Sequence, residues 1–197
     1  MRSKRLVSMF AVAVSAVVLL AGGCASAATN PPATNPPAAG VTSAAKTSAA
    51  DGTVHFIGYS KNSDGPDLTA ILTGAVGDYG PAVTVHPNGT VDPEHTSELR
   101  LGLKKGSFRL SIASLDKKIV SVTSHWPSTP TCSFHLSVTA ATPVVSGSGT
   151  GLYRGISGSI NMTVTIDEVD VKPCPNGTSR FLSQLIFLVG AGTVSFG

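Results

Sequence analysis

The sequence predicts an all-β fold: a single small antiparallel β-barrel of about eight strands, preceded by a disordered tether. Three observations lead to this prediction. Apolar and polar residues alternate with a period of two in many stretches, turn-forming residues separate these stretches at short intervals, and no stretch has the periodicity and caps of an amphipathic helix. Closing such strands into a barrel would remove the exposed edges of the sheet.

The alternation is clearest at 159–167, where Ile160, Met162, Val164 and Ile166 fall on one face of an extended chain. The polar residues between them fall on the other face. We predict further strands at 53–59, 68–76, 81–86, 98–103, 107–112, 118–124 and 133–140, with the apolar tail 180–197 lying centrally or closing the sheet.

Residues 1–23 have the composition of an export signal. Arg2, Lys4 and Arg5 precede an apolar run that ends at Leu20. The following Ala21, Gly22 and Gly23 lead into Cys24 and resemble a bacterial lipobox, in which Cys24 would be lipidated and become the mature N-terminus. We therefore expect a lipoprotein anchored to the cell membrane on its extracytoplasmic side. The alternative is plain secretion, with Cys24 lost or inert.

Removal of this signal changes the charge. The chain has 14 basic and 11 acidic side chains, and three of the basic ones lie in residues 1–23, so the mature chain has 11 of each. A neutral mature chain gives no support for binding to nucleic acid or to an anionic membrane, and both ideas are set aside.

Residues 24–52 form a second compositional zone, which repeats ATNPP at 28–32 and 33–37 and contains almost nothing large and apolar. We expect a disordered, Pro-stiffened tether there. Residues 53–197 are long enough for one domain with its own core.

Two cysteines remain if Cys24 carries lipid. Cys132 and Cys174 would form a disulfide in the oxidising compartment that the export signal implies. A metal or redox CxxC site is the alternative, but neither cysteine has a second cysteine at that spacing.

The stretch GSGTGLYRGISG at 147–158, here called the glycine ladder, contains five glycines. It does not match a dinucleotide fingerprint or a phosphate loop, and it precedes a predicted strand rather than a helix. We interpret it as a bend with close backbone contacts. Tyr153 within it covers a glycine or stacks on a ligand at the barrel mouth. Trp126 either anchors a ligand or packs near the disulfide.

We assign no catalytic residue, metal site or cofactor. The histidines occur singly, and GxSxG is absent. Asp167 and Glu168 are adjacent on one strand, so their side chains should point to opposite faces. The polar residues of the turn at 86–95 suit either a cation or, more simply, solvent; they are His86, Asp92, Glu94 and His95.

Several segments together resemble a family of actinobacterial exported proteins with a domain similar to the allene oxide cyclase and dirigent barrels. They are NGTVDPEHTSELRLGLKKGSFRL, the TC at 131–132, the glycine ladder with its following strand, KPCPNG, and the closing GAGTVSF; the most specific positions are Gly149, Gly151, Tyr153, Gly155, Ile156 and Gly158. The resemblance implies a small eight-stranded barrel. Plant relatives hold a reactive apolar intermediate inside the barrel, but the interior faces expected here are aliphatic and provide no acid or base.

The leading hypothesis is a monomeric, non-enzymatic envelope module that binds a small apolar ligand or an envelope partner. A cyclase- or isomerase-like enzyme acting on an apolar intermediate is the first alternative. A structural surface protein without a ligand is the second.

Overall fold

A computed structural model describes residues 50–61, 67–91, 97–123, 130–171 and 181–197. Its strands form a single eight-stranded sheet in which all neighbours are antiparallel, in the order β5-β4-β3-β2-β1-β8-β7-β6. The strands are β1 (Gly52–Lys61), β2 (Asp67–Gly74), β3 (Asp78–Val85), β4 (Glu98–Leu103), β5 (Gly106–Ser111), β6 (Ser133–Pro143), β7 (Ile156–Asp170) and β8 (Phe181–Phe196).

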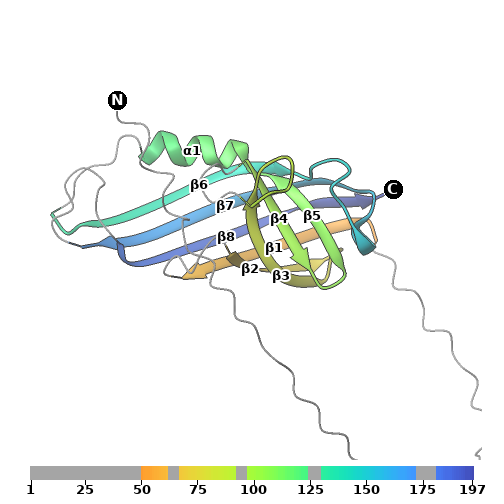
Figure 1. Cartoon of the computed structure of the whole chain (residues 1–197), viewed down its shortest axis with the longest axis horizontal. Helices are drawn as coiled ribbons and strands as arrows, with labels where there is room; N and C mark the ends of the chain where they lie inside the picture. Colours follow the sequence, from red (N-terminus) through yellow and green to blue (C-terminus); the bar gives the residue numbers. More distant parts are fainter. Residues whose placement is uncertain (1–49, 62–66, 92–96, 124–129, 172–180) are drawn as a thin grey trace, which may run out of the picture. The chain divides into compact units, whose positions relative to one another are not determined.

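The sheet is strongly curled into a half-barrel (Figure 1). The predicted all-β, eight-stranded antiparallel fold is confirmed, and the tail lies centrally as β8, between β1 and β7. Closure is partial: the two edge strands β5 and β6 are not neighbours, and an isolated bridge joins Leu110 to Val144 just beyond the end of β6.

The inner face of the curled sheet holds the core. Ile160, Met162, Val164 and Ile166 are all buried, as their alternation predicts. They pack in one cluster with large side chains from the other strands, most of them fully enclosed: Phe56, Leu72, Leu99, Leu101, Phe108, Leu110 and Tyr153. Side chains, rather than an open lumen, therefore occupy this part of the interior.

The strand predicted at 118–124 is wrong. Its described residues belong to helix α1 (Ala113–Thr123). Leu115, Ile119 and Thr123 recur every four residues and face the core, and the Thr123 hydroxyl donates to the Ile119 carbonyl at 2.8 Å. A short run of β-branched residues is compatible with a strand or with a helix. The packing of Leu115, Ile119 and Thr123 against the core selects the helix.

Helix α1 lies along β6, one edge of the sheet (Figure 1). The Lys118 ammonium donates to the Thr139 carbonyl of that edge strand at 2.5 Å. The helix thereby covers backbone groups that β6 would otherwise offer to another strand.

The glycine ladder runs beside the other edge strand, β5, between β6 and the start of β7. Backbone N–H groups of Val145, Thr150 and Leu152 donate to β5 and the turn before it, at 2.8 to 3.0 Å. Gly151 has φ +58°, and a Cβ there would lie 2.4 Å from the Lys105 oxygen. The interpretation of the ladder as a bend with close backbone contacts is confirmed.

Candidate functional site

Tyr153 is the predicted ligand-contact residue that the structure describes, and it is 1% exposed. The short 3-10 helix η2 (Gly151–Tyr153) carries it inward, so that its ring meets Phe108 edge-on with centroids 5.4 Å apart. Its hydroxyl donates to Asp78 Oδ2 at 2.6 Å. A ligand would reach this ring only after the surrounding core had moved, and the ligand-contact role stays a prediction.

The Asp78 carboxylate accepts hydrogen bonds from three segments of the chain. It accepts the Tyr153 hydroxyl and the backbone N–H groups of Tyr79 and Lys105, the latter two at 2.8 and 2.9 Å. Burial raises the pKa of Asp78, but these hydrogen bonds lower it more, so its pKa is below the usual value. Burial and the bond to Asp78 raise the pKa of Tyr153. At neutral pH the pair is therefore a carboxylate and a neutral phenol, with a structural role.

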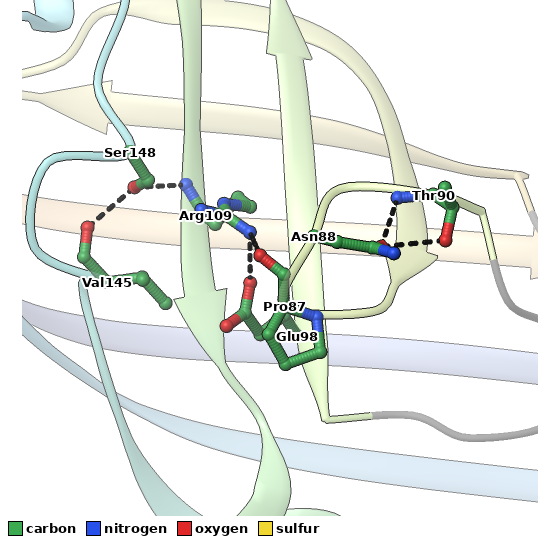
Figure 2. Close-up of polar contacts among 7 residues, drawn as sticks. All are labelled: Pro87, Asn88, Thr90, Glu98, Arg109, Val145 and Ser148. Carbon is green, nitrogen blue, oxygen red and sulfur yellow. Dashed lines mark hydrogen bonds and ion pairs between the residues drawn. The ribbon is translucent and has the colours of Figure 1, made fainter.

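A second structural contact joins the loop after β3 to β5 (Figure 2). Arg109 Nη1 donates to Glu98 Oε2 at 2.8 Å and to the Pro87 carbonyl at 2.6 Å. The Arg109 backbone N–H donates to Ser148 Oγ at 3.0 Å, and that hydroxyl donates to the Val145 carbonyl. The same arginine thus connects this loop to the segment that includes the glycine ladder.

The expectation of a purely aliphatic interior is wrong. Glu168 on β7 is 6% exposed, and Gln184 on β8 is buried beside it and donates from Nε2 to Glu168 Oε2 at 2.5 Å. Burial and a hydrogen bond with Asp170 raise the pKa of Glu168 to about 7, while the bond from Gln184 lowers it in part. Glu168 is two residues after Ile166 and therefore lies on the same inward face of β7 as Ile160 and Ile166. The alternation in the sequence could have predicted its inward position.

Asp167 points to the outer face, which confirms the prediction that the two adjacent carboxylates diverge. His135 Nδ1 lies 2.6 Å from Asp167 Oδ1, and both side chains are more than half exposed. A surface pair of this kind contributes about 0.2–1 kcal/mol. It borders a hollow of 530 Å³ on the sheet, lined by Ser133, Phe134, His135, Asp167, Glu168, Val169, Ser183 and Leu185.

In the part of the chain that the structure describes, no three His, Cys, Asp or Glu residues gather as they would around a metal ion. Cys132, which immediately precedes β6, is buried. The other predicted site residues lie outside the described residues: Cys24, Trp126, Cys174, Asp92, Glu94 and His95.

The most unusual surface is the outer face of the sheet at its centre. Register places Ile57 of β1 between Ile71 of β2 and Val189 of β8, and it places Tyr59 beside Phe187. These five side chains and Leu185, two residues before Phe187, are each 38–44% exposed. We call this set of six the outer apolar face.

The outer apolar face is contiguous and uncharged. Taking about 200 Å² for a fully exposed side chain of this size, the six together present about 500 Å² to solvent. Around Ile57, Ile71 and Val189 the outward-facing positions of the same three strands are neutral or histidine: Thr53, His55, Thr69, Thr73, Ala191 and Thr193. At the other end of the face, Leu185 pairs in register with Lys61 of β1 and with Asp167 of β7. An apolar patch of this size lies in the range of the largest patch on a typical monomer, and such a patch is often functional. The sequence shows the alternation but not that these residues align across strands.

Comparison with known proteins identifies no relative: no protein-family model, no curated protein and no solved structure matches the chain. Within the described ranges, the helical content includes no segment of the length and hydropathy needed to span a membrane.

Proposed function

We propose that this chain is a non-catalytic binding module of the cell envelope that acts through its outer apolar face. The single observation that supports this most is the contiguity of that face, six side chains on three adjacent strands. The filled core around Tyr153 favours an external partner over an apolar ligand carried in that part of the interior.

The proposal includes the features expected from the N-terminal sequence. Cys24 carries lipid, residues 24–52 serve as the tether, and the domain faces the extracytoplasmic side of the membrane. Cys132 and Cys174 form a disulfide. We also propose that the domain belongs among the barrels of the allene oxide cyclase and dirigent type, on the basis of the sequence resemblance. A curled eight-stranded antiparallel sheet is compatible with this fold.

A cysteine-labelling experiment tests whether the outer apolar face is covered in the envelope. Ile57→Cys places a thiol on this face, and Val120→Cys places one on helix α1; the two native side chains are equally exposed, at 44%. We expect a bulky maleimide to label Ile57→Cys more slowly than Val120→Cys in intact cells, and both equally in purified protein. Equal labelling in cells would show that the face is uncovered, and the proposal would fail.

The anchor has its own test. Cys24→Ala should release the protein from the membrane into the medium. Membrane retention unchanged by this substitution would contradict lipidation.

A cyclase- or isomerase-like enzyme is the second candidate, because Glu168 supplies the inward-facing acid that such chemistry requires. Its pKa of about 7 would suit general acid or base work at neutral pH. We rank this candidate second because the Glu168 carboxyl is buried and already accepts a hydrogen bond from Gln184. Glu168→Gln should abolish any turnover of an apolar epoxide or quinone-methide probe, and absence of turnover in the unmodified protein would dismiss the enzyme.

A further inference from the structure

We infer that the occupant of the outer apolar face is the surface of a lipid bilayer, the same membrane that holds the proposed anchor. This inference rests on the proposed function, since it names the partner of the same face. The domain would lie on the membrane through β1, β2 and β8 instead of extending from it on the tether.

The shape of the face favours a bilayer over a second copy of this chain. The six side chains offer about 500 Å², so a second copy would also have to cover the polar surface around them to reach the about 800 Å² per partner of a stable protein interface. Their exposure places them on the side of the sheet opposite the buried core, which is the outer, convex side because the sheet is strongly curled (Figure 1). Two convex surfaces of fixed shape touch over only a fraction of either one, but lipids rearrange around whatever is inserted among them.

The chemistry of the side chains also suits a bilayer surface. Ile57, Ile71, Leu185 and Val189 are aliphatic, Phe187 adds a ring, and Tyr59 pairs with it across β1 and β8. Tyrosine is enriched at the level of lipid headgroups, where its ring is in an apolar layer and its hydroxyl in a wet one. The mature chain has no net charge, so docking would depend on apolar contact and would be insensitive to salt.

The length of the expected tether makes weak docking sufficient. Residues 25–51 separate Cys24 from the start of β1, the central strand of the face. A flexible chain of that length has a root-mean-square extension of about 30 Å, and its prolines lengthen this somewhat. Short tethers give effective concentrations in the millimolar range. A face with a dissociation constant near 1 mM would therefore be docked for about half of the time.

The experiment measures partition into vesicles without the lipid anchor. The chain from Ala25 to the C-terminus, which keeps every described element, is sedimented with phosphatidylcholine vesicles at millimolar lipid and with vesicles that also contain phosphatidylglycerol. Ile57→Thr with Val189→Thr replaces two aliphatic side chains of the face, which are paired in register, by threonine and keeps the β-branching. Val120→Thr with Val122→Thr is the matched control on α1, where both valines are similarly exposed.

We expect the unsubstituted chain to bind both vesicle types equally, with the same partition at low and high salt. The face variant should bind at least about tenfold more weakly, because both substitutions remove apolar surface that would otherwise enter the bilayer. The control variant should bind as the unsubstituted chain does.

Three results would overturn the inference, and the first two also separate it from the proposed function. If vesicles bind nothing but analytical ultracentrifugation finds a dimer that the face variant loses, the occupant is a second copy, and the face remains a binding surface. If vesicles bind nothing, the protein is monomeric and Ile57→Cys is fully labelled in cells, then the proposed function also fails. Binding that requires phosphatidylglycerol and disappears at high salt would contradict docking by apolar contact.

Discussion

Tyr153→Phe probes how firmly the glycine ladder is attached to the rest of the sheet. The substitution keeps the ring that meets Phe108 and removes only the hydroxyl that donates to Asp78 Oδ2 at 2.6 Å. A hydrogen bond to a charged group contributes about 1.5–3 kcal/mol. Asp78 keeps two backbone donors, from Tyr79 and Lys105. We therefore expect the free energy of unfolding to fall by about 2 kcal/mol at neutral pH.

The pH dependence of this loss identifies its cause. The pKa of Asp78 is lowered in the folded protein, so its carboxylate contributes stability above its unfolded pKa, which is lost as pH falls through the folded value. The difference between the unsubstituted protein and Tyr153→Phe should be full at pH 7 and should shrink below about pH 4.

Urea unfolding followed by circular dichroism at several pH values measures this difference. Tyr59→Phe on the outer apolar face is the matched control, and its stability should change by less than about 0.5 kcal/mol. No loss of stability at pH 7, or a loss that grows as the carboxylate is protonated, would refute the role assigned to the Tyr153–Asp78 bond.

Three further substitutions test other parts of the fold. Gly151→Ala should lower the free energy of unfolding by about 3 kcal/mol, since φ is +58° and the added Cβ would meet a backbone oxygen at 2.4 Å. Gly147→Ala, at φ +69° with open space around it, should lower it by about 1 kcal/mol in the same thermal unfolding assay. Equal losses would contradict the close approach at Gly151. The pKa of Glu168 is raised to about 7 in the folded protein, so its contribution to stability is full below its unfolded pKa and is lost as pH rises to about 7. Glu168→Gln should therefore gain in Tm relative to the unsubstituted protein between pH 5 and pH 8, and a parallel pH profile would contradict the shift. Cys174→Ser should lower stability by about 4 kcal/mol through loss of the predicted disulfide to Cys132; two titratable thiols in the unfolded, unreduced parent would show instead that no such bond exists.

The strands could be predicted from the sequence because one face of each is buried and the other is exposed to solvent. Alternation at 159–167 gave both the strand and its inward set correctly. The same rule misassigned 118–124, because its four β-branched residues fit both a strand and a helix. Only the packing of Leu115 and Ile119 on the core decides between the two. Secondary structure in short segments is selected by tertiary contacts that a sequence does not display.

The candidate site could be predicted less well than the fold. The inward position of Glu168 follows from its phase in β7, although an acid at a core position runs against the usual preference for apolar residues. The outer apolar face depends on register: Tyr59 meets Phe187, and Ile57 meets both Ile71 and Val189. Register is fixed by turns and by the buried face of each strand, so alignment across strands appears only in the folded chain.

The position of β8 has a consequence for how the protein is made. Every residue of β1 pairs with β8, and Tyr59 meets Phe187, which is 128 positions later in the chain. Strand β1 can therefore pair with β2 early, but its other neighbour, β8, is absent until the end of the chain has been synthesised. Contacts over such sequence separations form slowly, because a long loop must close before any of them is gained. This order keeps the sheet from being completed before synthesis of the chain has ended.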